Sequence, residues 1–169
     1  MDKIVVAILV ENRFGVLNRI AGMFRRKGFN IDTLTVGETA DPKVSRITIT
    51  FYSEDDKEQI IKQLEKMPVV IKVAELDNAS SVSRELLLIK LKNDPAKRQD
   101  LMTVTEVFRT KIVDYTNENI IIEATGPSKK IDAFIDVVKP YGILEMCRTG
   151  VSALSRGVDQ ILEGKRREW

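Results

Sequence analysis

Apolar residues in the first part of the chain follow strand-like spacing and then helix-like spacing. Residues 4–10 are a short, almost continuous apolar run, which predicts a central strand. From 15 to 24 the apolar residues recur on one helical face, and Gly28 stands where a glycine commonly ends a helix. Residues 31–37 and 46–52 then predict two strands, and the second alternates strictly between its two faces.

A second helix and a fourth strand complete this pattern. The acidic segment 53–56 resembles a capping box at a helix start, apolar residues then keep helical spacing, and Pro68 ends the helix. Residues 69–76 predict the closing strand. The order strand–helix–strand–strand–helix–strand is that of the ferredoxin-like unit, in which two helices cover one face of an antiparallel sheet.

The same order of elements recurs in the second half of the chain. Asp94 with Pro95, and Pro127 with Ser128, open the two predicted helices. Four apolar segments predict the strands, at residues 85–92, 111–115, 120–124 and 143–147. The chain is therefore predicted to contain two diverged copies of one topology.

These patterns predict an α+β protein made of two tandem ferredoxin-like βαββαβ units. The small, polar segment 79–83 is expected to be a linker, because such composition is typical of domain connections. The first domain is expected at residues 1–78, the second at 84–157 and a tail at 158–169.

The first strand is apolar on both of its faces. Val5, Ala7 and Leu9 alternate with side chains that are equally apolar. The helices of a ferredoxin-like unit cover only one face of the sheet, so the other face needs a separate cover. We expect a second subunit, the second domain or another partner to provide it, and we therefore expect an oligomer.

Composition narrows the possible functions. The 169 residues are 43% hydrophobic and 31% charged, and the formal net charge of +2 gives no strong field for nucleic acid. Strand 4–10 has no aromatic residue on which RNA bases could stack. The longest apolar run is too short to cross a bilayer, the first residues lack signal-peptide features, and the single cysteine has no internal partner. We expect a cytoplasmic protein that binds neither nucleic acid nor membranes.

Residues able to carry catalysis or hold a metal are scarce. Histidine, the commonest general base and metal ligand, is absent. Asp55 and Asp56 could form a metal pair, but acidic residues at a helix start usually stabilise the helix dipole. The segment 126–130 is interpreted as a strand-to-helix turn with solvated lysines, and Cys147 as a buried, unreactive thiol in a strand. We predict no catalytic residue and no metal site.

The turn before the first helix is the candidate binding site. Backbone amides at a helix start lack internal partners and lie at the positive end of the helix dipole, so a carboxylate can dock there. Gly15 allows close approach to the backbone, and Asn12 and Asn30 each offer a donor and an acceptor.

A side-by-side dimer would combine these groups. Asn30 of one subunit would face Gly15 of the other, and one free amino acid would be held between them. Val16, Leu17 and Ile31 would suit an aliphatic side chain. Each of these residues is also common in ordinary turns and cores, so the chemistry of the residues leaves both interpretations open.

Residues 10–17 and 26–36 resemble an ACT domain, and more narrowly the small regulatory subunits of acetolactate synthase (acetohydroxyacid synthase). Further matching segments lie at residues 41–48, 83–86, 148–151 and 154–157. The resemblance extends in order over almost the whole chain and ends near Gly157.

This resemblance implies a non-catalytic subunit. Such subunits bind the thiamine-diphosphate-dependent catalytic (large) subunit, raise its activity and confer feedback inhibition by valine. The implied valine site lies at the ACT dimer interface, at Asn12, Gly15 and Asn30, with the helix-start amides near Val16 and Leu17. Thiamine diphosphate, Mg²⁺ and FAD are expected on the catalytic partner and no cofactor on this chain.

An alternative is a free-standing amino-acid-binding ACT sensor or a transcriptional co-regulator. The sequence leaves open which branched-chain amino acid binds best, which surface meets the catalytic subunit and in what stoichiometry. It also leaves open the role of the basic tail at residues 165–167.

Overall fold

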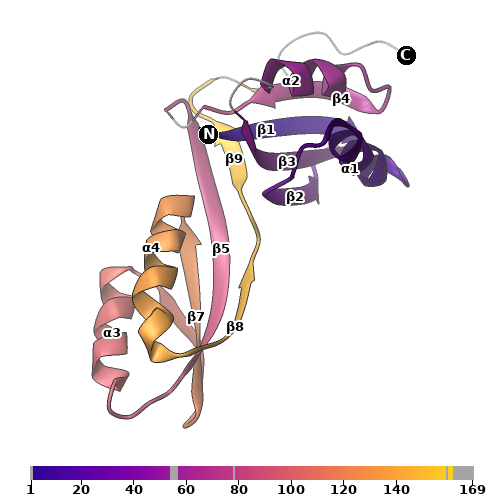
Figure 1. Cartoon of the computed structure of the whole chain (residues 1–169). Helices are drawn as coiled ribbons and strands as arrows, with labels where there is room; N and C mark the ends of the chain where they lie inside the picture. Colours follow the sequence, from indigo (N-terminus) through magenta and orange to yellow (C-terminus); the bar gives the residue numbers. More distant parts are fainter. Residues whose placement is uncertain (1, 54–56, 78, 159, 162–169) are drawn as a thin grey trace. The chain divides into compact units, whose positions relative to one another are not determined.

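The chain folds into two structural units, each built on an antiparallel sheet (Figure 1). The computed structural model describes residues 2–53, 57–77, 79–158, 160 and 161. The first unit comprises the described residues up to Val82 together with those from Val151 onward, and the second comprises Ser83–Gly150.

The first unit has the element order predicted from the sequence. Its strands are β1 (Asp2–Glu11), β2 (Thr33–Glu38), β3 (Val44–Ser53) and β4 (Val70–Glu75), and its helices are α1 (Val16–Lys27) and α2 (Lys57–Glu65). The strands lie in the order β2-β3-β1-β4, and every neighbouring pair is antiparallel. This is the ferredoxin-like arrangement, so the prediction for this half is confirmed.

Helices α1 and α2 cover one face of this sheet (Figure 1). Ile8 of β1 is fully buried there together with Ile20 and Phe24 of α1. The Phe24 ring meets Phe51 of β3 edge-on, with the ring centroids 5.7 Å apart. The helix ends at Gly28, as predicted, and the left-handed backbone of this glycine lets its N–H cap the last turn.

The opposite face of the sheet is covered by the C-terminal part of the same chain. The described residues of 151–161, which we call the C-terminal strap, contain the short strand β9 (Ser152–Ser155). Val5 and Ala7 of β1 pack there, and Thr48 and Thr50, their cross-strand partners on β3, are buried on the same face. The other members of this apolar cluster are Leu76, Val151, Ala153 and Ile161.

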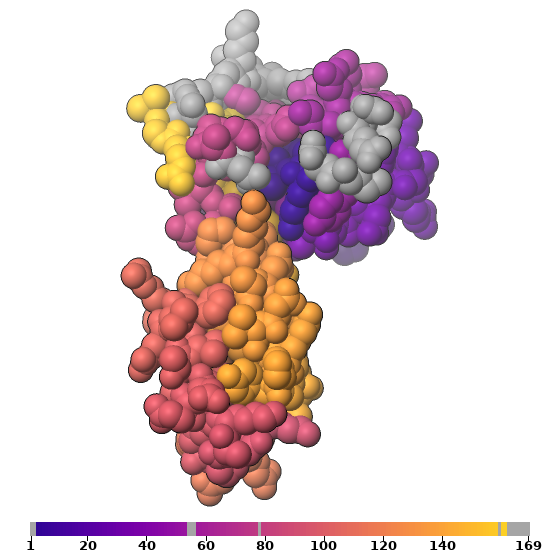
Figure 2. Space-filling model, turned by 60° about the vertical axis from the view of Figure 1, so that its left-hand side comes forward, coloured from indigo at the N-terminus to yellow at the C-terminus, as the bar shows by residue number. Residues whose placement is uncertain are grey.

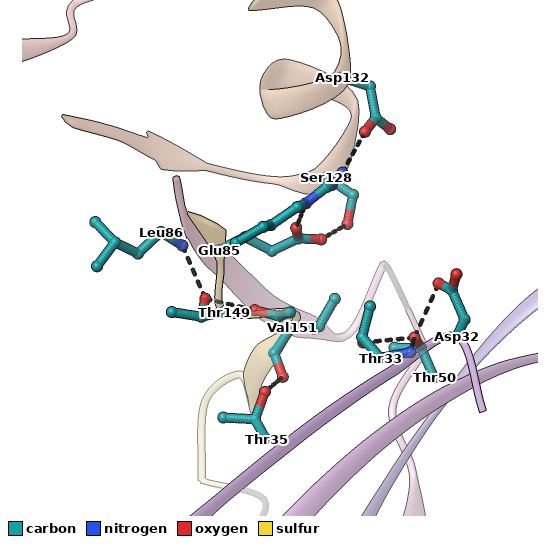
Figure 3. A network of polar contacts seen from close by, with 12 residues as sticks. Asp32, Thr33, Thr35, Thr50, Glu85, Leu86, Ser128, Asp132, Thr149 and Val151 are labelled. Carbon is teal, nitrogen blue, oxygen red and sulfur yellow. Dashed lines mark hydrogen bonds and ion pairs between the residues drawn. The ribbon is translucent and has the colours of Figure 1, made fainter. Parts of the chain in front are cut away.

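Two hydrogen bonds hold the strap on the sheet. Thr35 Oγ1 of β2 donates to the carbonyl of Val151 at 3.0 Å (Figure 3), and Arg46 Nη2 of β3 donates to the carbonyl of Ala153 at 2.7 Å. Burial lowers the pKa of Arg46, although a guanidinium stays charged near neutral pH. Val151 and Ala153 of the strap fall within residues 84–157, which were expected to form the second domain, so the cover of Val5 and Ala7 comes from the same chain. This face therefore gives no argument for an oligomer.

The second unit repeats the topology. Its strands are β5 (Ser81–Lys92, which begins in the first unit), β6 (Lys111–Tyr115), β7 (Asn119–Gly126) and β8 (Ile143–Arg148), and its helices are α3 (Arg98–Val107), α4 (Ser128–Val138) and the 3₁₀ turn η1 (Lys139–Tyr141). The strand order β6-β7-β5-β8 matches that of the first unit, and β9 also pairs with β5. Helices α3 and α4 lie side by side (Figure 1), and in Figure 2 their salmon and orange segments meet at the surface. Phe108, at the end of α3, and Phe134 of α4 are in ring contact, with their centroids 5.3 Å apart.

Some local expectations differ from the structure. Three residues of the expected linker 79–83 belong to β5, because the backbone carbonyls of Ser80 and Ser81 accept hydrogen bonds from Arg156 of the strap. Residues from Val151 were grouped with the second domain, whereas their contacts lie in the first unit. Cys147 lies in β8 as expected but is exposed, because it pairs with Leu88 on the uncovered face of the sheet. Residues 54–56, with the expected capping segment and the Asp55–Asp56 pair, lie outside the described residues.

A charged network lies in the second unit (Figure 3). The Glu85 carboxylate is buried and accepts hydrogen bonds from Ser128 Oγ and Arg148 Nε. Arg148 Nη1 also donates to Asp132 at 2.8 Å. Partial burial lowers the pKa of Arg148, but the hydrogen bonds to Glu85 and Asp132 outweigh this effect and raise the pKa above its usual value. The network ties β5 to β8 and to the start of α4.

Substitution of the strap should expose its contribution to stability. Ala153→Asp places a carboxylate among apolar side chains at a position only 6% exposed, and we expect a loss of about 3 kcal/mol in the free energy of unfolding. Its neighbour Leu154 is 62% exposed, so the matched variant Leu154→Asp should change stability by less than about 0.5 kcal/mol. Urea unfolding followed by circular dichroism measures both, and equal losses would contradict the strap's packing.

Removal of the buried carboxylate should also be costly. Glu85→Ala leaves the Arg148 guanidinium without its buried partner, and we expect a loss of about 3 kcal/mol in unfolding free energy. The control Glu106→Ala removes an exposed carboxylate from α3 and should cost less than about 0.5 kcal/mol. A Glu85→Ala variant as stable as this control in urea would refute a stabilising role for the network.

Candidate functional site

Asn12 follows β1 and connects it to the β2–β3 hairpin. Its backbone N–H donates to the carbonyl of Lys43 at 2.7 Å. Its side-chain Nδ2 donates to Glu38 Oε1 at 2.8 Å and to the carbonyl of Pro42 at 2.9 Å. Both amide hydrogens are therefore used within the chain, while Oδ1 accepts no hydrogen bond from the described residues. The exposed Asn12 thus presents a fixed acceptor to a ligand.

Helix α1 begins without a side-chain cap. Gly15 is the N-cap residue, with φ +82°, and the first turn contains no acidic residue. The Val16 amide donates to the carbonyl of Arg13 at 3.4 Å, whereas the amides of Leu17 and Asn18 have no acceptor within the described chain. These two N–H groups lie at the positive end of the helix dipole, which favours a carboxylate.

The surface above this helix start is open. A Cβ at Gly15 would meet no atom within 4 Å, so the glycine is required here by its backbone conformation and not by crowding. The side chain of Phe14 is fully exposed, and that of Leu17 is 41% exposed. Val16 is only 5% exposed and packs in the core, so its side chain does not reach this surface.

Asn30 and Ile31 lie beyond the other end of α1. The helix has 12 residues, which corresponds to a length of about 18 Å. Asn30 is exposed, and Ile31, just before β2, packs partly against the core. The fold of one chain therefore does not bring these two residues to Asn12 and Gly15.

Two features of this region were missed by sequence reasoning. Glu38 holds the Asn12 side chain, but the two residues are 26 positions apart and no local pattern connects them. Phe14 lies between the predicted site residues, and its apolar character in a turn was the available signal.

Neither a metal-binding cluster nor a membrane-spanning helix is found in the described part of the chain. Within residues 2–53, 57–77, 79–158, 160 and 161, no three acidic or cysteine side chains are grouped so that they could hold a metal ion. None of the helices formed by these described residues has the length and apolar character needed to cross a membrane.

Comparison with known protein families gives two matches, one in each half of the chain. Residues 6–72 match the family described as an ACT domain like that of the acetohydroxyacid synthase small subunit, and residues 84–157 match the family described as the small subunit of acetolactate synthase. The first match includes all six candidate site residues, and the two matches together cover most of both sheets.

Individual relatives agree with these matches. The chain is 50% identical over 153 residues to a probable acetolactate synthase small subunit of Archaeoglobus fulgidus, covering 90% of this chain and 96% of that protein. It is 44% identical over 160 residues to the acetolactate synthase small subunit of Bacillus subtilis, covering 94% and 93%. The crystal structure of the small subunit from Thermotoga maritima superposes with a TM-score of 0.86 at 39% identity, covering 93% and 99%.

Gly15, the N-cap of α1, and Gly22, inside α1, should respond in opposite ways to substitution by alanine. Gly15→Ala forces a Cβ into the left-handed region and should lower the unfolding free energy by about 1–2 kcal/mol, although there is space for the methyl group. Gly22→Ala replaces a helix-interior glycine and should raise it by about 0.5–1 kcal/mol. Urea unfolding tests both, and equal effects would contradict a conformational requirement at Gly15.

Proposed function

The chain belongs to the family of acetolactate synthase small subunits, and we propose that it is a non-catalytic regulatory subunit that activates the catalytic (large) subunit and makes it sensitive to valine. In this proposal it acts in the cytoplasm, in the biosynthesis of isoleucine, valine and leucine. Thiamine diphosphate, Mg²⁺ and FAD belong to the catalytic partner, and this chain holds no cofactor.

The uncapped start of α1 is the observation that carries the proposal. The free amides of Leu17 and Asn18 offer two donors to the carboxylate of an amino acid. The Oδ1 of Asn12 offers an acceptor to its ammonium group, and the exposed part of Leu17 offers an apolar contact to its side chain. An amino acid presents these three kinds of group together, so the site suits a sensor of aliphatic amino acids.

A second copy of the chain would complete this site. Strand β2 is at the edge of its sheet, so its outer backbone groups are available for pairing with another β2. Such a side-by-side pair would bring Asn30 and Ile31 of one protomer toward the Gly15 turn of the other. Two-fold symmetry would then produce two equivalent valine sites per dimer.

Regulation follows from a ligand that contacts both protomers. Valine would stabilise the dimer geometry in which the pocket is complete, because its affinity for that geometry is higher. Coupling between sites is typically about 1–3 kcal/mol, which is a change of about 5- to 150-fold in an equilibrium. A change of this size is sufficient to alter the activity of a bound catalytic subunit without any acid, base or metal in the pocket.

Substitution of the site should separate activation from inhibition. In holoenzyme reconstituted with the catalytic subunit, Asn12→Ala, Gly15→Asp and Asn30→Ala should each retain activation within about twofold and raise the valine concentration for half-inhibition at least about tenfold. Asn117→Ala removes another exposed turn asparagine, from the second unit, and should behave as wild type. Wild-type inhibition in all three site variants would refute the proposed pocket.

Mixing two defective variants tests whether the site is shared. When equal amounts of Asn12→Ala and Asn30→Ala are combined, half of the dimers contain one chain of each variant. Each of these mixed dimers has one site with both asparagines intact and one site with both replaced. About a quarter of the valine sites should therefore return, measured by valine titration in a calorimeter. A free-standing sensor would still bind valine in this assay but would neither bind nor activate the catalytic subunit.

A further inference from the structure

Helices α1 and α2 form a groove on the side that faces away from the sheet. Its volume is about 350 Å³. The residues that line it are Arg19, Met23, Arg26, Gln63, Lys66, Met67 and Pro68. The proposed valine site does not use this surface, since none of its residues lines the groove.

The groove has a local excess of positive charge. Helix α1 has four cationic residues, Arg19, Arg25, Arg26 and Lys27, and no acidic residue, although the whole chain has a net charge of only +2. Arg19, Arg26 and Lys66 are exposed and form no ion pair with another described residue. The guanidinium of Arg26 lies over Gly22, and a Cβ added at Gly22 would be 3.5 Å from Nη1 of Arg26. The absence of a side chain at Gly22 thus leaves room for this cation to lie along the helix.

The floor of the groove is apolar. Met23 is almost fully buried, and Met67 packs against the same core. Methionine adapts its shape to a partner, and methionine and arginine are both enriched in protein interfaces. The groove therefore combines a deformable apolar floor with cations at its rim.

This combination favours a protein segment over a small anion. A free phosphate or carboxylate would be held only by exposed, solvated side chains, and such contacts are weak and screened by salt. An acidic segment can pair with several cations at once and also place an apolar side chain on the methionines. Nucleic acid fits less well, because the groove has no aromatic side chain on which bases could stack.

We propose that the α1–α2 groove docks a segment of the catalytic subunit that bears several carboxylates beside an apolar side chain. This inference rests on the proposed function, because it takes the catalytic subunit as the partner. The cations of the groove attract the segment, and the methionine floor holds its apolar side chain.

Charge reversal in the groove tests the proposal. The double variant Arg19→Glu/Arg26→Glu should weaken binding of the purified catalytic subunit at least about tenfold, measured by calorimetry on the full chain. The matched variant Arg25→Glu/Lys27→Glu makes the same charge change on the same helix outside the groove, and should change affinity less than about threefold. The wild-type affinity should also fall more steeply with rising salt than that of the groove variant.

Each outcome has a distinct meaning. Valine should raise the melting temperature of both variants as in wild type, which shows that the fold and the effector site are intact. Equal weakening by the two double variants, or no weakening by the groove variant, overturns the docking proposal. Inorganic phosphate could instead stabilise the wild type but not Arg19→Glu/Arg26→Glu, while both bind the catalytic subunit equally well. This result would assign the groove to a small anion and would also overturn the docking proposal. Failure of the wild type to bind the catalytic subunit refutes the proposed function itself.

Discussion

Burial of both faces of β1 is the constraint on which the first unit depends. Its even-numbered residues pack under α1 and α2, whereas Val5 and Ala7 pack under the C-terminal strap. A strand with two apolar faces cannot remain at a solvated surface, so the fold needs a third layer beyond the usual sheet and helices. The strap supplies this layer from the far end of the chain, and both strap and sheet are therefore needed for a stable first unit.

The three-layer arrangement also explains how the candidate site is formed. With its core face buried, α1 has fixed ends, and the left-handed Gly15 and Gly28 set where the helix starts and stops. The start has free amides because no side chain caps it, and Asn12 is held beside it by Glu38 and Pro42. The same helix separates this half of the proposed pocket from Asn30, and for this reason the proposed pocket is completed by a second copy of the chain.

The outer surface of α1 is available for a different role. The face of α1 that points to the sheet is apolar, its amino end favours a carboxylate, and its outer face presents unpaired cations beside α2. A helix with three distinct surfaces can respond to an effector at one end while it contacts a partner along its side. The proposed valine site and the proposed docking groove therefore share one helix, which gives the coupling between them a physical basis.

The sequence by itself determined the two βαββαβ units, the end of α1 at Gly28 and the family, because these depend on residue spacing within short segments and on residue identity. It also placed Asn12, Gly15 and Asn30 in the turns that bound α1. Only the tertiary structure decided that the strap covers β1, since Thr35–Val151 and Arg46–Ala153 join residues 116 and 107 positions apart. The same holds for the exposure of Cys147 and for the α1–α2 groove. Local periodicity shows which faces of a strand or helix are apolar, but the distant segment that packs on each face is decided by the fold.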